Sequence, residues 1–70
     1  MKRPSKLQWI MYDERTDIIE PMEAPITDED DITEIMSSVV SERQVIGWGE
    51  YTRLLAVTAP YGHVGYYLAD

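Results

Sequence analysis

The residues best suited to carry chemistry in this chain are four consecutive carboxylates, Asp28, Glu29, Asp30 and Asp31, which follow Thr27. A calcium site needs oxygens that converge from alternating positions of a loop, with a glycine for the sharp turn. Here the acids are adjacent and no glycine follows them, so we expect their side chains to diverge and to hold no metal. The run is typical of a first helical turn, where carboxylates meet the positive end of the macrodipole. It could also contact a protein partner.

Other residue types offer little for catalysis or cofactor binding. His63 is the one histidine, and the absence of cysteine excludes thiol catalysis and cysteine-ligated zinc or iron–sulfur sites. No serine follows the pattern of a hydrolase nucleophile elbow, and the two glycines at 47 and 49 make no phosphate-binding motif. A fold of this size should also offer little room for a substrate cleft of ~300 Å³ or more. We therefore expect a protein that is not an enzyme and binds no cofactor.

Charge is distributed unevenly along the chain. Six basic and thirteen acidic residues give a net charge of −7, and Lys2, Arg3 and Lys6 lie in the first six positions. Residues 13–34 contain ten acids and only one basic residue, Arg15. Such a surface repels phosphate backbones and anionic membranes and attracts basic surfaces. We expect a protein partner, with no direct binding to nucleic acid or membrane.

Cellular location is predicted from what the chain lacks. No apolar run approaches the ~18–20 residues that span a bilayer, and residues 7–12 are too short for a secretory signal. The absence of cysteine fits a reducing compartment. These features favour the cytoplasm, and no motif assigns the chain to a known family.

Short apolar or alternating segments predict four strands. The first two form a hairpin, and Pro21 and Pro25 restrict the second of them to a sheet edge, because proline cannot donate to the ladder. The last two are joined across residues 59–62, whose Ala-Pro-Tyr-Gly sequence suits a type I turn. The four predicted segments are residues 7–12, 17–20, 50–59 and 64–68.

One amphipathic helix is predicted over residues 28–43, with Thr27 as its N-cap. Its apolar stripe follows the 3.6-residue period and consists of Ile32, Ile35, Met36, Val39 and Val40. The resulting order, ββαββ, predicts an α+β two-layer sandwich with the helix on one face of a four-stranded, mainly antiparallel sheet. We expect residues 7–70 to form this single domain and residues 1–6 to form a loose basic tail.

The aromatic residues suggest where a partner would bind. All seven are tyrosine or tryptophan, which are enriched at binding hot spots. One helix covers only one face of such a sheet, and the adjacent Tyr66 and Tyr67 point to opposite faces. The uncovered face would then expose one tyrosine together with Ile10 and either Leu54 or Leu55, and such an apolar patch usually marks an interface.

The favoured function is therefore a small acidic adaptor or inhibitor that docks on another protein. Tyr51, Tyr66 and Tyr67 would supply the contact, and the acids of residues 28–31 would steer the encounter. The uncovered face could also pair two copies of the chain as a homodimer.

Three alternatives stay open. One is an enzyme, which would require His63 or a pair of acids to lie in a real pocket with a shifted pKa. The ten carboxylates of residues 13–34 could imitate a phosphate array and occupy the basic groove of a DNA- or RNA-binding protein, as compact acidic inhibitors carried by phages and mobile elements do. Such mimicry should weaken steeply with salt, whereas apolar docking should not. A purely structural subunit of a larger assembly would share the same sequence features.

Overall fold

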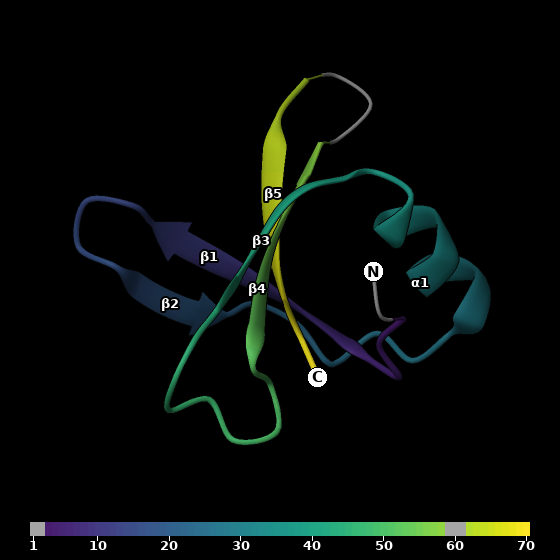
Figure 1. Cartoon of the computed structure of the whole chain (residues 1–70), viewed down its shortest axis with the longest axis horizontal. Helices are drawn as coiled ribbons and strands as arrows, with labels where there is room; N and C mark the ends of the chain where they lie inside the picture. The colour runs from purple at the N-terminus through teal and green to yellow at the C-terminus, as the bar shows by residue number, and fades with distance from the viewer. Residues whose placement is uncertain (1–2, 59–61) are drawn as a thin grey trace.

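The computed structural model of the chain describes residues 3–58 and 62–70, which contain one helix and five strands (Figure 1). In chain order these are β1 Leu7–Asp13, β2 Ile18–Pro21, α1 Glu29–Met36, β3 Val39–Gln44, β4 Arg53–Thr58 and β5 Val64–Ala69. All four strand pairings are antiparallel, and the order in the sheet is β2-β1-β5-β4-β3. The predicted α+β fold with one helix on an antiparallel sheet is confirmed, but the sheet has five strands instead of four and the order is ββαβββ instead of ββαββ.

The additional strand replaces the second half of the predicted helix. α1 ends at Met36, and the chain turns through two serines into β3, so the predicted bounds of residues 28–43 are wrong beyond that point. Val39 and Val40 continue the helical spacing, but their branched side chains favour strand over helix. Val39 pairs with Val57 of β4, and Thr58 N donates to Ser38 O at 3.0 Å. Pairing with β4 therefore decides the conformation of this segment.

The start of α1 follows the predicted acidic pattern with a shift of one residue. Asp28, and not Thr27, is the N-cap: its Oδ1 accepts from the backbone N of Asp30 at 2.9 Å and of Asp31 at 3.1 Å. Together with Glu29, these two residues form an acidic first turn that is exposed to solvent. The carboxylates thus satisfy and complement the amino end of the helix.

Each face of the sheet carries a hydrophobic core. The cluster under α1 contains Leu7, Ile32, Leu55, Val57 and Ala69. A second cluster on the opposite face contains Ile10, Leu54 and Leu68, which are exposed by only 2%, 4% and 0%. The open apolar face expected from a single helix is therefore wrong.

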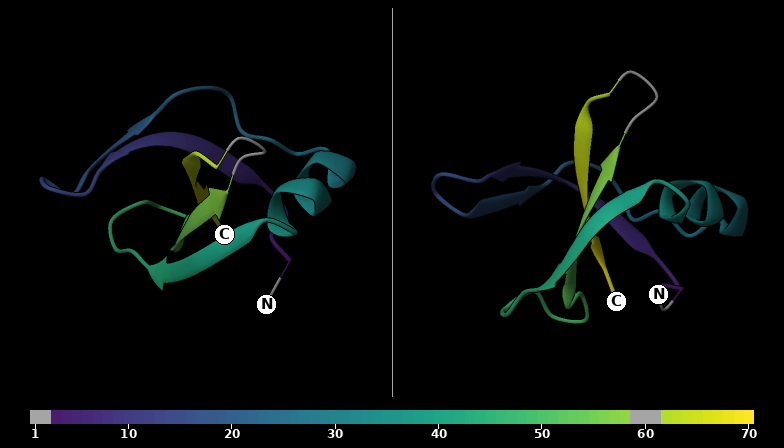
Figure 2. Two further views of the ribbon diagram at one scale, coloured as in Figure 1. Left: turned by 90° about the horizontal axis from the view of Figure 1, so that it is seen from above. Right: turned by 45° about the horizontal axis from the view of Figure 1, so that its top comes forward.

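The strong twist of the sheet covers the second face. The β1–β2 hairpin crosses β4 and β5 at a steep angle, and β3 lies beyond β4 on the other side (Figures 1 and 2). Trp48 and Tyr51, from the segment between β3 and β4, pack against the second cluster, as do Tyr12 and Ile19 from the hairpin. The twist of the sheet and the segment between β3 and β4 thus cover the face that lies opposite α1.

The amino-terminal residues pack more closely than a loose tail would. Pro4 is buried, Arg3 donates to Glu29 O at 2.8 Å, and Ser5 N donates to the Asp70 carboxylate at 2.9 Å. Lys6 forms an ion pair with Glu50. Residues 3–6 therefore tie the start of β1 to α1 and to the end of β5.

Several smaller predictions can be compared with this fold. β2 lies at a sheet edge, as its proline predicted. The predicted turn at residues 59–62 falls largely on residues 59–61, outside the described residues. No helix in residues 3–58 and 62–70 is long and apolar enough to cross a membrane.

Candidate docking surfaces

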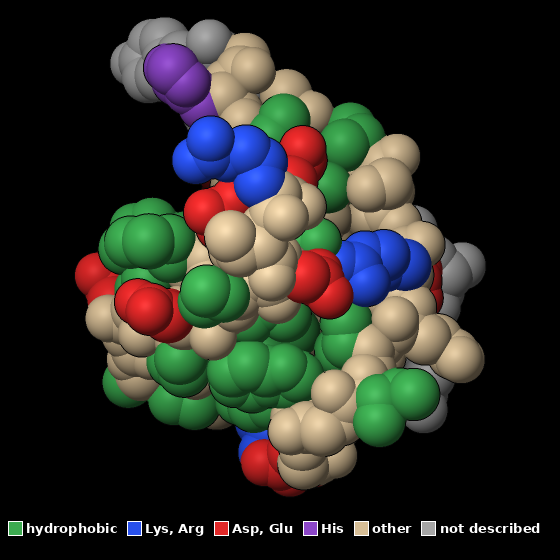
Figure 3. Space-filling model, turned by 90° about the vertical axis from the view of Figure 1, so that its left-hand side faces the viewer, with side chains coloured by type: hydrophobic (Ala, Val, Ile, Leu, Met, Phe, Trp, Pro, Cys, Tyr) green, Lys and Arg blue, Asp and Glu red, His purple; other side chains and the backbone are tan. Residues whose placement is uncertain are grey.

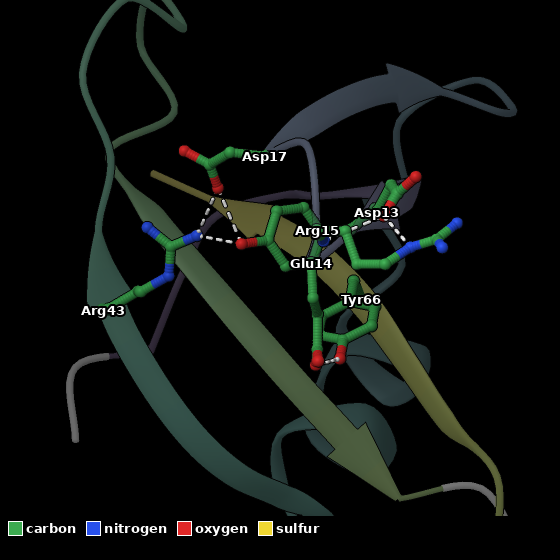
Figure 4. Close-up of polar contacts among 7 residues, drawn as sticks. Asp13, Glu14, Arg15, Asp17, Arg43 and Tyr66 are labelled. Atoms are coloured by element: carbon green, nitrogen blue, oxygen red, sulfur yellow. Dashed lines mark hydrogen bonds and ion pairs between the residues drawn. The ribbon is translucent and has the colours of Figure 1, made fainter.

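The acidic segment of residues 13–34 divides into two parts that lie far apart. Asp13, Glu14 and Asp17 belong to the β1–β2 turn, at the left of Figure 1, whereas the acids of α1 lie at the right. The turn acids are engaged within the chain: Glu14 accepts from Tyr66 Oη at 2.6 Å and Asp17 lies 3.0 Å from the Arg43 guanidinium (Figure 4). Asp13 accepts from the backbone N of Arg15 at 2.9 Å, so all three carboxylates form contacts within the chain.

The Asp17 contacts join the hairpin to the sheet edge at β3. Tyr12 donates to Asp17 Oδ1 at 2.7 Å, and Arg43 Nη2 donates to Tyr12 Oη at 2.5 Å. The hydrogen bond from Tyr12 and the Arg43 guanidinium hold the pKa of Asp17 below its usual range, against the opposing effect of desolvation. The same interaction with Asp17 raises the pKa of Tyr12. These three side chains therefore connect the β1–β2 hairpin to β3 beside the second core.

Acidification should weaken the contacts that Asp17 makes with Tyr12 and Arg43. Because the Asp17 pKa is lowered in the folded state, its contribution to stability is complete above the ordinary aspartate pKa of ~3.9. That contribution disappears as the pH falls through the lower, folded value. Thermal unfolding followed from pH 6 to pH 2 should show a smaller acid destabilisation for Asp17→Asn than for the wild type. Identical pH profiles would show that the contact contributes nothing.

The second part of the acidic segment forms no ion pair within the described residues, although the Asp28 carboxylate caps α1. Seven exposed carboxylates run from β2 into α1: Glu20, Glu23, Asp28, Glu29, Asp30, Asp31 and Glu34. Within residues 3–58 and 62–70 the ion pairs are Lys6–Glu50, Arg15–Asp13, Arg43–Asp17 and Arg53–Glu42, and none involves these seven groups. The uncompensated negative charge of the described chain is therefore concentrated around α1.

An apolar groove lies directly beside this charge. It has a volume of about 570 Å³ and runs between the end of α1, the start of β3 and the neighbouring parts of β4 and β5. We call it the α1 groove; it is lined by Glu34, Ile35, Ser37, Ser38, Val39, Val40, Val57, Thr58, Gly65 and Tyr67. Burial raises the pKa of the Tyr67 phenol, with a further contribution from the charge of Glu23, so this ring is neutral at physiological pH.

Helical spacing places two of these acids one turn before the acid that lines the α1 groove. Glu34 lines it, and Asp30 and Asp31 precede Glu34 by four and three residues. Residues at these spacings lie on the same side of a helix. The groove therefore offers apolar walls with Glu34 in its lining, and two further carboxylates lie one helical turn before that residue.

A second groove lies on the opposite face of the sheet, between β3 and the β1–β2 turn. It has a volume of about 530 Å³, and we call it the β3 groove; it is lined by Tyr12, Glu14, Val40, Ser41, Glu42, Arg43, Leu54, Ala56, Val64 and Tyr66. The rings of Tyr12 and Tyr66 meet edge to face at 5.0 Å, and the Arg43 guanidinium lies 5.4 Å from the Tyr12 ring centre. The two grooves show that the fold has more concave surface than its length predicted.

Of the three tyrosines predicted to bind a partner, two lie on the face of the second core and one on the face of α1. Tyr66 and Tyr67 point to opposite faces as expected: Tyr66 lines the β3 groove and Tyr67 the α1 groove. Tyr51 packs on the second core, with Lys6 Nζ 5.6 Å from its ring centre. Ile46, which is 98% exposed, was missed, although the Gly-Trp-Gly sequence beside it marks a shaped loop.

Among the described residues, the carboxylates and hydroxyl groups that line the two grooves are accompanied by no histidine. His63 is exposed and lines neither of them. Among the residues whose structure is described, no three histidine, aspartate or glutamate side chains are grouped so that they could hold a metal ion. What the grooves present is apolar and aromatic surface with charge at the rim.

Comparisons with known proteins identify no relative. The chain matches no protein family, and no curated protein or solved structure is significantly similar to it. Function has to be inferred from the two grooves and the charge around them.

Proposed function

We propose that this protein is a small acidic module, an adaptor or inhibitor without enzymatic activity, that docks on another protein through the α1 groove. The observation that carries the proposal is an apolar groove whose lining includes Glu34, a carboxylate that forms no ion pair among the described residues. The expected partner is a segment that combines one or two apolar side chains with lysine or arginine. Compared with the sequence-based expectation, the docking site moves from the opposite sheet face to the groove under Tyr67.

The two features have different roles in binding. Burying one valine- or leucine-sized side chain in the groove contributes about 1.5–3 kcal/mol. An exposed ion pair at the rim contributes only about 0.2–1 kcal/mol, but a negative potential accelerates encounter with a basic partner. Apolar contact should therefore set the dissociation rate, and the α1 acids should set the association rate and the choice of partner.

A peptide selection followed by paired charge reversals tests this proposal. Peptides selected from a random display library on the immobilised protein should be enriched in apolar residues flanked by lysine or arginine. Glu34→Arg, at the rim of the α1 groove, should weaken their binding by about tenfold, because like charges then face each other. Glu20→Arg, on β2, makes the same change in net charge and should alter the affinity by less than about threefold. Equal effects of the two variants, measured by calorimetry, would contradict docking at the groove.

A second candidate is mimicry of nucleic acid, and the seven unpaired carboxylates from β2 into α1 favour it. A nucleic-acid-binding protein would then be captured along this whole acidic edge. Glu20→Arg and Glu34→Arg should weaken such binding alike, and affinity should fall steeply with salt concentration. Docking in the α1 groove should depend on salt mainly through the association rate.

A further inference from the structure

The segment between β3 and β4 presents an isoleucine whose side chain is almost fully exposed to solvent. Ile46 is 98% exposed, while Trp48 and Tyr51 of the same loop pack against the second core. Two backbone hydrogen bonds close the loop, Val45 N to Thr52 O at 2.9 Å and Tyr51 N to Trp48 O at 3.0 Å. The glycines at 47 and 49 have φ values of +89° and +60°, which other residues rarely adopt. The loop is thus shaped so that Ile46 projects into solvent.

The β3 groove, which could accept the Ile46 side chain of another copy, lies on the same face of the sheet as this loop. The β3 groove and the loop both border the second core, since Leu54 and Tyr66 belong to the groove and to that cluster. Figure 3 views the side of the molecule opposite α1 and shows a broad hydrophobic area across its lower half. A projecting apolar side chain and a groove with aliphatic and aromatic walls on one face make that face self-complementary, which is the requirement for pairing across a two-fold axis.

Charge also permits two copies to meet here. The basic side chains of this region are paired within the chain, in Arg43–Asp17, Arg53–Glu42 and Lys6–Glu50. The second carboxylate that lines the β3 groove, Glu14, accepts from Tyr66 Oη at 2.6 Å. The seven unpaired carboxylates lie on β2, on α1 and between them, whereas the loop lies across the sheet from the helix, at the lower left of Figure 1. At physiological salt, charges more than ~8 Å apart are largely screened. Repulsion between the acidic regions would therefore oppose contact through this face only weakly.

We propose that two copies of the chain pair through this face, with Ile46 of each copy seated in the β3 groove of the other. A stable interface of standard size needs about 800 Å² from each partner, roughly one sixth of the 4851 Å² surface of the chain. Pairing would cover Ile46 and the half-exposed aromatic residues of the second core. It would leave the α1 groove open, so it is independent of the proposed partner docking.

Sedimentation equilibrium of the full chain tests the pairing. The wild type should associate to a dimer, and Ile46→Asp should raise the dimer dissociation constant at least 30-fold. Met22→Asp is the matched control, because Met22 is also exposed and lies outside both the loop and the β3 groove; it should change the constant by less than threefold. Both side chains are exposed, so circular dichroism should show both variants folded. A wild type that stays monomeric up to millimolar concentration overturns the proposal.

A crosslinking experiment tests the register of the pair. The chain has no cysteine, so Ile46→Cys and Ser41→Cys each introduce a single thiol, the second of them in the β3 groove. Mixing the two variants under mild oxidation should give the mixed disulfide dimer in preference to either homodimer. Mixing Met22→Cys with Ser41→Cys should give no such preference. Equal crosslinking in the two mixtures would overturn the placement of Ile46, whereas the peptide affinities described above would be unaffected.

Discussion

Replacing Leu54 with alanine is expected to lower the free energy of unfolding by about 2–4 kcal/mol, as much as replacing Leu55. The two residues are adjacent in β4 and point to opposite faces; they are 4% and 0% exposed. A sheet covered on one face only would tolerate one of these changes at little cost. Equal losses are expected because each face of this sheet carries its own core.

Urea denaturation of the two variants measures this directly, with Thr58→Ala as the control. Thr58 ends the same strand and is exposed, so its replacement should change stability by less than about 1 kcal/mol. A loss below ~1 kcal/mol for Leu54→Ala would mean that the face opposite α1 is effectively open to solvent.

Arg53→Met should be the most damaging change at a charged residue, with a loss of about 2–4 kcal/mol. Its side chain is 10% exposed, and the guanidinium donates to Asp70 O from Nε at 3.0 Å and from Nη2 at 2.8 Å. Nη1 also lies 3.4 Å from Glu42 Oε1. The substitution keeps much of the apolar volume but leaves these acceptors without their donor.

Arg43→Met is the matched control for the loss of an arginine. Arg43 pairs with Asp17 and Tyr12, but its side chain is 49% exposed, and exposed ion pairs contribute less than about 1 kcal/mol. Thermal or chemical unfolding should therefore rank the two variants clearly. Similar losses would show that burial of the guanidinium is not what makes Arg53 important.

Local patterns predicted the β1–β2 hairpin, the edge position of β2 and the acidic start of α1, because short-range chemistry decides these features. The end of α1 could not be predicted in this way. Val39 and Val40 fit a helical stripe and a strand equally well, and their pairing with β4, distant in sequence, selects the strand. The additional strand, β3, thus depends on pairing with β4, which the periodicity of its own residues does not predict.

The candidate site was predicted only in part, for a related reason. Strand alternation placed Tyr66 and Tyr67 on opposite faces, and composition identified the acidic segment. Neither property reveals how far a sheet twists, so the covering of the second face by Trp48 and Tyr51 was not foreseen. Composition also does not reveal which carboxylates form ion pairs within the chain. Asp17 forms one with Arg43, whereas Glu34 lines a groove.

The most direct test of the central claim is a titration of ¹⁵N-labelled protein with the tightest peptide from the display selection, followed by amide chemical shifts. Docking in the α1 groove predicts that the largest changes fall on residues 34–40 and on Val57, Gly65 and Tyr67, with small changes on residues 18–23 and 45–52. The claim would be contradicted if the largest changes lay along residues 20–31 or on the β3–β4 loop.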